Sequence, residues 1–336
     1  MASATAPYYA GRERSLAELF DVGEVTVAVD HLVLDGRRVP VIDDVIVMLP
    51  PARLPELARS RISHGGSTPM NDLDFAADIQ YSFGAEWTDH GALLPEHHLE
   101  FEAYFDLVEL KSLSEHRIGD LGCGSGRWAW FVAPYCRELV VTDFSDAIFV
   151  ARANLSEHPN VIFVMADVLD LPFADDALDF AYCLGVLHHL PVDALEACRR
   201  LAPVTPELLV YLYYALDNRP EYFRWILRTV TAARRQLARV TNRRARNAVS
   251  FVLAVIIYAP LGWVGRIGGG LAKRYIPLAD TYAGKSLRRL QQDAYDRFFT
   301  AIEQRFTREQ IHTLEDTFGR VSVSDGTPYW HFLCQR

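Results

Sequence analysis

A buried strand that runs directly into a glycine-rich turn constrains this chain more than any other feature. Residues 118–126 read Ile-Gly-Asp-Leu-Gly-Cys-Gly-Ser-Gly, with glycine at every second position of the turn. Glycine reaches positive φ angles, allows the backbone to approach a ligand closely, and lets a following helix pack tightly on the strand. We therefore expect a ligand-binding loop, followed by a short helix that begins near Gly126 and ends at Pro134.

Further apolar runs follow at the spacing of a doubly wound α/β sheet, and acidic residues end two of them. Residues 139–142 lead into Asp143, an acid that can accept both hydroxyls of a ribose. Residues 161–165 lead to Asp167 at the same expected edge. Because the carboxyl ends of parallel strands meet at one edge of a sheet, the loop and these acids should surround one ligand.

This arrangement resembles the class I S-adenosylmethionine-dependent methyltransferases, whose first motif matches Asp-Leu-Gly-Cys-Gly-Ser-Gly at 120–126. The resemblance covers residues 117–217 and, more faintly, 307–336. It implies an α/β fold with a doubly wound, seven-stranded, mostly parallel Rossmann-like sheet. It also implies S-adenosylmethionine as cofactor and S-adenosylhomocysteine as product. The glycine spacing departs from the Gly-x-Gly-x-x-Gly dinucleotide fingerprint, so a nicotinamide cofactor is the weaker alternative.

The resemblance also implies where individual residues lie around the cofactor. The three glycines of the turn would pass close to its methionine part, with Asp120 near the amino group. Asp143 would hold the ribose, Asp167 would meet the adenine amino group, and the residues that follow each acid would flank the adenine. Cysteines beside the loop are better explained as small packing residues than as nucleophiles. The expected cofactor-binding residues are Asp120, Gly122, Cys123, Gly124, Gly126, Asp143, Phe144, Asp167, Val168 and Cys183.

Methyl transfer from a sulfonium is an in-line displacement, so the enzyme must chiefly align nucleophile, methyl and sulfur in a dry pocket. His188 and His189 follow the expected fourth strand, and either could take a proton from an acceptor hydroxyl. The phrase Val-Leu-His-His-Leu equally suits a structural role. Tyr104, Tyr213 and Tyr214 are the expected substrate contacts, against the alternative that they simply pack on the sheet.

The chain has 336 residues, of which half are apolar or aromatic, enough for a substantial core. Its five cysteines form no Cys-x-x-Cys pair and are odd in number, so neither a disulfide framework nor a metal site is expected. The first twenty residues are polar and mixed in charge, unlike a signal sequence. We therefore expect a cytoplasmic protein.

Four parts follow from these patterns. Residues 24–49 alternate around Asp35-Gly36, a favoured hairpin turn, which predicts strands at 25–34 and 38–49. This unit is similar to the end of zinc-ribbon modules but lacks their cysteines, so we interpret it as a packing or dimerisation element, which leaves a homodimer open. The expected division is a β unit at 1–59, a linker and helical lead-in over the cofactor pocket at 60–110, a core at 111–217 with 307–336, and a helical insertion at 218–306.

The segment 218–306 differs from the rest in charge and hydropathy. Residues 219–275 contain twelve Arg or Lys and one acid, a net of +11 in a chain whose total is −9. This asymmetry favours an anionic partner, against the alternative of a solvated helix face. Residues 248–265 carry no charge. A single membrane crossing would separate strands of one sheet, so we expect a buried helix in a substrate cap or, alternatively, a helix lying in a membrane interface, with peripheral contact through 234–275.

The leading hypothesis is a methyltransferase that acts on a small-molecule or lipid-linked, anionic or neutral, acceptor beneath a helical cap. Methylation of RNA or another nucleic acid is an alternative that the arginines favour. It is disfavoured because the fourth strand leads into Cys-Leu-Gly-Val and not the Asn/Asp-Pro-Pro-aromatic motif of base amino methylases. A binding or scaffold protein that keeps the fold without catalysis is the other alternative, and transfer of aminopropyl or carboxymethyl groups is a further one.

Overall fold

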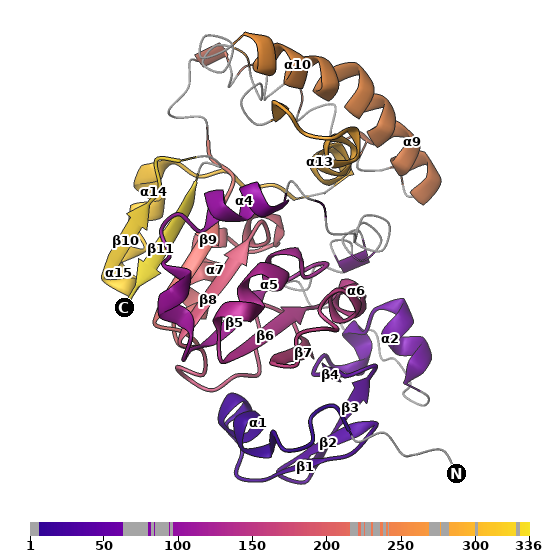
Figure 1. Ribbon diagram of the computed structural model, residues 1–336, viewed down its shortest axis with the longest axis vertical. Helices are drawn as coiled ribbons and strands as arrows, with labels where there is room; N and C mark the ends of the chain where they lie inside the picture. The colour runs from indigo at the N-terminus through magenta and orange to yellow at the C-terminus, as the bar shows by residue number, and fades with distance from the viewer. Residues whose placement is uncertain are drawn as a thin grey trace.

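The computed structural model describes residues 7–62, 97–215, 242–268, 282–299, 302–326 and 330–336, together with a few isolated positions between 80 and 276. Within these residues one mixed sheet carries helices on both faces, and a separate helical layer lies at one end of the molecule (Figure 1). Most of the expected lead-in at 60–96, the linker included, falls outside the described residues, as does much of 216–241.

The N-terminal part forms a helix, four short strands and two further helical turns. Their bounds are α1 (Glu13–Phe20), β1 (Val25–Val27), β2 (His31–Leu34), β3 (Arg37–Ile42), β4 (Val45–Val47), η1 (Pro51–Arg53) and α2 (Glu56–Arg61). The turn between β2 and β3 is made by Asp35 and Gly36, both at positive φ. The strand expected at 38–49 is broken in two, because Asp43 and Asp44 also adopt positive φ and form a second tight turn. Short acidic side chains tolerate this backbone region.

The core alternates strands and helices as the apolar runs predict. Its elements are α4 (His97–Tyr104), η2 (Leu110–Leu113), β5 (Arg117–Leu121), α5 (Arg127–Val132), η3 (Ala133–Tyr135), β6 (Glu138–Asp143), α6 (Ala147–Asn154), β7 (Val161–Met165), β8 (Phe180–Leu184), η4 (Leu187–His189), α7 (Ala194–Leu201), β9 (Glu207–Tyr211), α14 (Arg308–His312), α15 (Glu315–Phe318), β10 (Arg320–Val323) and β11 (His331–Gln335). Thr307 and Gln310 form a capping box at the start of α14.

The sheet has eleven strands, which corrects the expected number of seven. Their order is β1-β2-β3-β4-β7-β6-β5-β8-β9-β11-β10, and the last seven are the strands expected for the core. β4 pairs parallel with β7, with Val45 opposite Phe163, so the N-terminal strands extend the core sheet. All three residues of β4 are buried, as in an inner parallel strand covered on both faces. β11 runs antiparallel between β9 and β10.

Two apolar clusters lie on the two faces of this sheet. The first includes residues of α1, α7, α14 and α15, and the second includes residues of α4, α5 and α6. Every residue of β5, β7 and β8 is buried, because helices cover both faces of these parallel strands. The carboxyl ends of β5, β6, β7 and β8 therefore share one edge, from which the loops with the predicted site residues emerge.

The described part of the 218–306 segment is a layer of helices. α9 (Arg243–Leu253) continues through a π-helical turn, η5 (Ala254–Tyr258), into α10 (Ala259–Ile267), and α13 (Leu287–Phe299) packs against them. The helix continues through Pro260, which lies in the first turn of α10. The π turn comes directly before Pro260, which lacks the N–H that a regular α-helix would use.

The apolar helix in this layer is exposed along one face, unlike the buried cap helix expected as the first alternative. Arg244–Ile267 is long and apolar enough to cross a membrane by length and composition, and 28% of its apolar window is buried. Its inner face, with Ala254 and Tyr258, contacts α13. The large apolar side chains exposed to solvent on this helix are Phe251, Val252, Val255, Ile256, Ile257, Trp263 and Ile267.

Candidate functional site

The glycine loop lies between β5 and α5, and each of its three glycines has a positive φ: 82° at Gly122, 54° at Gly124 and 73° at Gly126. A Cβ on Gly122 would lie 2.6 Å from a methyl group of Val186. A Cβ on Gly126 would lie 3.1 Å from Ala151, so glycine there allows α5 and α6 to pack closely. The positive φ angles predicted for these glycines are therefore confirmed, whereas their contact with a ligand stays a prediction.

The side chain of Asp120, directly before this loop, lies in the protein interior. It is 2% exposed, and its Oδ2 atom has no hydrogen-bond partner among the described residues. Burial raises the pKa of Asp120 to about 8, an effect that the neighbouring Tyr182 hydroxyl opposes and the Asp143 carboxylate reinforces. A buried acceptor without a partner is costly, so this atom is suited to a ligand that donates a hydrogen bond or carries a positive charge.

Asp143 supports the loop from the end of β6. Its Oδ2 accepts from the Gly124 amide at 2.9 Å, and its Oδ1 accepts from the Ser145 amide at 2.8 Å and the Ser145 hydroxyl at 2.6 Å. A carboxylate has about four acceptor sites, so roughly one remains for a ligand hydroxyl. Burial raises the pKa of Asp143, and these three hydrogen bonds oppose the shift. Phe144 follows it and packs against the α4–α6 side of the sheet.

Asp167 follows β7 at the same edge and is 5% exposed, next to Val168 at 9%. Its Oδ2 lies 3.6 Å from Nη1 of Arg53, and its Oδ1 accepts from the Leu169 amide at 3.0 Å. The Gln80 side chain donates to the carbonyl oxygens of Arg53 at 2.9 Å and Phe144 at 2.5 Å. The N-terminal part thus closes this side of the site. Nothing in the sequence pattern singled out Arg53 or Gln80.

The two cysteines of the predicted site are packing residues in the described structure. Cys123 is 5% exposed and Cys183 is fully buried, and both belong to apolar clusters. Burial raises the pKa of both thiols well above the ordinary value, so neither forms a reactive thiolate near neutral pH.

His188 and His189 lie in η4, after β8, and are 0% and 2% exposed. His189 Nδ1 is 2.8 Å from the Ile302 carbonyl oxygen, which fixes the ring by a donated N–H. The His188 carbonyl oxygen accepts from the Gln304 amide at 2.9 Å, so η4 also anchors the chain as it returns from α13. The His188 ring stands 4.0 Å from the Tyr213 ring. A base role for either histidine stays a prediction.

Aromatic rings extend from α4 to the end of β9. Tyr104 lies 5.1 Å from Tyr211, and Tyr211 lies 5.8 Å from Tyr213, between ring centroids. Two of the three expected substrate tyrosines, Tyr104 and Tyr213, are therefore connected through Tyr211. Tyr211 was not among the predicted substrate contacts, although alternation along a strand places it on the same side as Tyr213. Tyr214 points to the other side, where its ring meets Trp330 at 6.1 Å.

The helical layer contributes charged residues to this end of the site. Glu100 of α4 forms two hydrogen bonds with Arg289 of α13, at 3.0 and 3.1 Å, and an ion pair with Lys285 at 2.7 Å. Asp293 pairs with the same two cations. Burial alone would raise the pKa of Glu100, but Arg289 and Lys285 hold it well below its usual range. This cluster fastens the 218–306 segment to the core.

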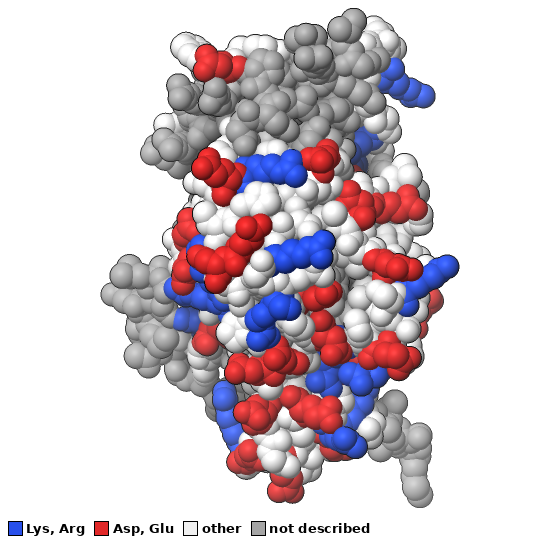
Figure 2. All heavy atoms as spheres, turned by 90° about the vertical axis from the view of Figure 1, so that its left-hand side faces the viewer, with Lys and Arg blue, Asp and Glu red and all other residues white. Residues whose placement is uncertain are grey.

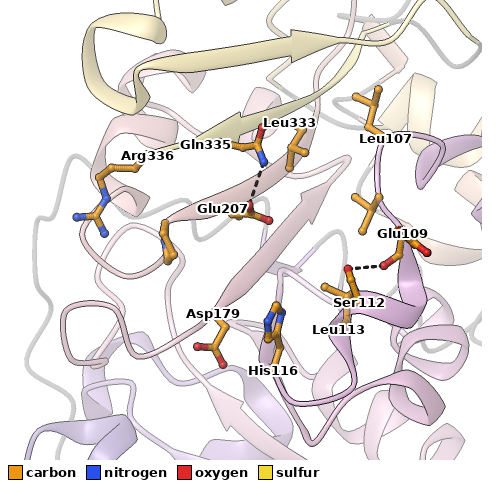
Figure 3. Close-up of a pocket in the computed structure, with 12 residues that line it drawn as sticks. Leu107, Glu109, Ser112, Leu113, His116, Asp179, Glu207, Leu333, Gln335 and Arg336 are labelled. Carbon is orange, nitrogen blue, oxygen red and sulfur yellow. Dashed lines mark hydrogen bonds between the residues drawn. The ribbon is translucent and has the colours of Figure 1, made fainter.

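A pocket of about 500 Å³ lies elsewhere on the domain (Figure 3). Its lining includes His116 before β5, Asp179 before β8, Glu207 at the start of β9 and Gln335 at the end of β11. In Figure 3 the Gln335 amide donates to Glu207 across its upper side. These residues mark the amino ends of the parallel strands, so this pocket is at the edge opposite the glycine loop and its acids.

Comparison with known proteins agrees with the geometry of the loop. Residues 118–205 match a family model described as a methyltransferase domain. We refer to the part of the core that contains these residues as the methyltransferase domain. The match begins with β5 and the glycine loop and ends after α7, so it includes all the expected cofactor residues and both histidines.

Similar proteins share the same region. An uncharacterized methyltransferase of Bacillus subtilis, YcgJ, is 31% identical over 111 residues, 31% of this chain and 44% of that protein. The 27-O-demethylrifamycin SV methyltransferase of Amycolatopsis mediterranei is 34% identical over 94 residues, 26% of this chain and 34% of that protein. The crystal structure of YcgJ aligns over 34% of this chain and 51% of that chain, with 28% identity and a TM-score of 0.31. The chain thus spans less than half the length of both curated relatives.

The methyltransferase domain supports S-adenosylmethionine as the cofactor, and the loop fits this group. The unpartnered Asp120 oxygen beside the loop can accept from an amino group. Asp143 retains acceptor capacity for a ribose hydroxyl, and Asp167 lies at the end of the next strand.

Proposed function

We propose that the protein is an S-adenosylmethionine-dependent methyltransferase whose acceptor binds between the ends of β8 and β9 and the 218–306 segment. The observation that carries this proposal is the glycine loop of the methyltransferase domain, with the buried, unpartnered Asp120 oxygen on one side and Asp143 on the other. The bound cofactor supplies an electrophilic methyl group on sulfur.

The chain's own residues bind, align and exclude water. Asp120 would hold the ammonium of the cofactor, Asp143 a ribose hydroxyl, and Asp167 the adenine amino group. Tyr104, Tyr211 and Tyr213 would form a wall that keeps the acceptor in line and dry. For an acceptor hydroxyl, His188 beside Tyr213 is the better placed of the two histidines to take its proton, since His189 Nδ1 is bonded to a carbonyl oxygen.

A small-molecule or lipid-linked acceptor suits this site better than a nucleic acid. On the face shown in Figure 2, acidic and basic side chains are interspersed over the coloured part of the surface, whereas nucleic-acid binding needs a continuous basic stripe. The arginines between 219 and 239, which favour the nucleic-acid alternative, lie outside the described residues. A salt-sensitive gel shift with RNA would support that alternative.

The cofactor proposal is tested by replacing Gly122 with alanine. The added Cβ would meet Val186 at 2.6 Å and strain a backbone with φ of 82°, so the loop must move. We expect S-adenosylmethionine affinity, measured by calorimetry, to fall by about tenfold or more. Gly36→Ala is the matched control, because φ is 81° there but a Cβ meets nothing within 4 Å and the turn is remote from the loop. Equal affinities in wild type and Gly122→Ala would contradict the cofactor assignment.

We also propose that the exposed face of α9 and α10 lies on an anionic membrane surface. Val252, Ile256 and Trp263 recur at helical spacing and are 50%, 68% and 63% exposed. Exposed Arg244 and Arg266 stand near the two ends of this face, and α9 to α10 carries no acid. An exposed apolar stripe with basic ends and an interfacial Trp is typical of helices that lie in a membrane interface.

Flotation with phosphatidylcholine vesicles, with and without phosphatidylglycerol, tests this surface. We expect binding that rises with the anionic lipid and falls by about tenfold or more in Ile256→Glu. Val29→Glu is the control, since Val29 is 71% exposed but lies between β1 and β2. No flotation at low salt would overturn the proposal, as would a stable dimer in solution that Ile256→Glu dissociates, because a second copy would then cover the face.

A further inference from the structure

Arg297 is a partly buried cation at the junction of the helical layer and the methyltransferase domain. It lies near the end of α13, the helix of that layer that faces the core in Figure 1. Its guanidinium stands 5.9 Å from the ring centre of Tyr213 and 5.7 Å from that of Tyr282. Tyr213 follows β9 and Tyr282 precedes α13, so the cation sits between the domain and the 218–306 segment.

No carboxylate of the described residues forms an ion pair with Arg297, and its guanidinium makes no hydrogen bond to them. Arg289, two turns earlier on the same helix, shows the opposite situation, with both Glu100 and Asp293 as partners. Asp293 is the acid that acts most on Arg297, but it is already held by Arg289 and Lys285. A partly buried guanidinium without a carboxylate partner keeps its N–H donors available for an anionic ligand.

A second guanidinium, that of Arg305, adds to the positive charge near the Tyr213 ring. Arg305 stands 5.3 Å from the same Tyr213 ring. Its Nη2 pairs with Glu303 at 2.7 Å, and its Nη1 donates to the Tyr214 carbonyl oxygen at 3.1 Å. Burial and the charge of Arg297 together lower the pKa of Arg305. Two guanidinium groups lie near one ring and only Arg305 is paired with a carboxylate, so the site has a net positive charge.

An uncommitted hydroxyl adds a second kind of donor. Tyr282 is 1% exposed, and its hydroxyl has no hydrogen-bond partner among the residues that the structure describes. Its ring is the one over which Arg297 lies. A guanidinium and a phenol hydroxyl are the donors that proteins use for carboxylates and phosphates.

We propose that Arg297, with Arg305 and the Tyr282 hydroxyl, binds an anionic group of the methyl acceptor, a carboxylate or a phosphate. This inference rests on the proposed function and assigns the end of the acceptor that lies away from the methyl group. The His188 ring, 4.0 Å from Tyr213, lies on the side of the domain that carries the cofactor loop, so an acceptor could reach from the arginines across Tyr213 towards that loop. The 218–306 segment would thus select the acceptor by charge.

Calorimetry with the full chain saturated with S-adenosylhomocysteine tests this site, with inorganic phosphate and acetate as separate probes. We expect at least one anion to bind and Arg297→Met to weaken it by about tenfold or more, the scale of a lost charge-assisted contact. Arg288→Met is the matched control, because Arg288 lies on the same helix but is exposed. Tighter binding of phosphate would indicate a phosphorylated acceptor, and tighter binding of acetate a carboxylate.

Thermal unfolding separates this role from a structural one. An arginine that holds the fold together would lower the melting temperature when replaced, whereas removal of a partly buried, unpaired charge should leave it nearly unchanged. We therefore expect Arg297→Met to lose anion binding without losing stability or S-adenosylhomocysteine affinity. Binding of neither anion by the wild type, or equal losses in Arg297→Met and Arg288→Met, would overturn the anion site. If the wild type does not bind S-adenosylhomocysteine at all, that result would instead contradict the proposed function.

Discussion

The methyltransferase domain and the 218–306 segment are held together by different interactions. The domain buries continuous apolar strands between two large clusters, and its polar residues gather at one edge of the sheet. The described part of the segment has one small cluster, around Tyr258 and Tyr295, and is fastened to the domain by buried ion pairs. An apolar core fixes the cofactor site rigidly, whereas charges at a junction can recognise a charged ligand. The difference suggests that one region holds the methyl donor and the other selects the acceptor.

If the two regions divide the work in this way, the largest effect should come from Asp143→Ala in the domain. The change removes the acceptor of the Gly124 and Ser145 amides, so the loop loses its support, and it also removes the carboxylate proposed to hold the ribose. We expect S-adenosylmethionine affinity to fall by about a hundredfold, the sum of two or more polar contacts of 1–2 kcal/mol each. Phosphate binding at Arg297 should change by less than about threefold. A comparable loss at both sites would show that the regions are not independent.

Glu100→Gln tests the junction from the other direction. It leaves Arg289 and Lys285 with one carboxylate, Asp293, and breaking a buried ion pair costs about 3 kcal/mol. We expect faster hydrogen exchange in α13 with little change in β5 and β6. Because the Glu100 pKa is depressed in the folded protein, its stabilising effect is present above the unfolded pKa and is lost as the pH falls through the folded value. The wild type should therefore approach the variant only in strong acid.

Hydrogen exchange that rises equally across the sheet and α13 in Glu100→Gln would contradict a separate junction. Arg14→Gln is the control, because its ion pair with Glu18 on α1 is exposed and such pairs contribute about 0–1 kcal/mol.

Asp120 should link cofactor affinity to pH. Its pKa of about 8 means that the free protein holds the carboxyl protonated at pH 7. Binding of an ammonium group favours the carboxylate, so a proton is released and S-adenosylhomocysteine affinity rises by up to about tenfold per pH unit between pH 6 and 7.5. Calorimetry in buffers of different ionisation enthalpy measures that proton. Asp120→Asn should release none.

The same group sets the direction of a stability change. Because the folded-state pKa is raised, stability is greatest below the unfolded pKa of about 4 and falls as the pH rises towards 8. Asp120→Asn should therefore unfold at a higher temperature than the wild type at pH 8.5, without ligand. A lower melting temperature would show that the carboxylate is already paired in the fold.

The sequence predicted the domain well because each feature there is local. Continuous apolar runs, glycines at 122, 124 and 126, and the capping box at Thr307 specify their structures within a few residues, and the structure bears them out. The sequence did not show that β4 would pair with β7, since the residues of a short apolar strand do not specify which strand it pairs with. It also missed Arg297 and Arg305, because the sequence alone does not distinguish an arginine that packs against aromatic rings from a solvated one.

Replacement of Arg53 should give the smallest effect. It tests whether the cofactor site is confined to the methyltransferase domain. Its guanidinium lies 3.6 Å from Asp167, and the two side chains are 13% and 6% exposed. The ion pair orients the Asp167 carboxylate, which is the proposed acceptor for the adenine amino group. We expect Arg53→Met to reduce the preference for S-adenosylhomocysteine over its inosine analogue, which has an oxo group in place of the amine, by about threefold. Arg38→Met, on the exposed side of β3, should leave that preference unchanged. An unchanged preference in Arg53→Met would confine adenine recognition to the domain, whereas the expected loss would extend the site into the N-terminal strands that lengthen the sheet.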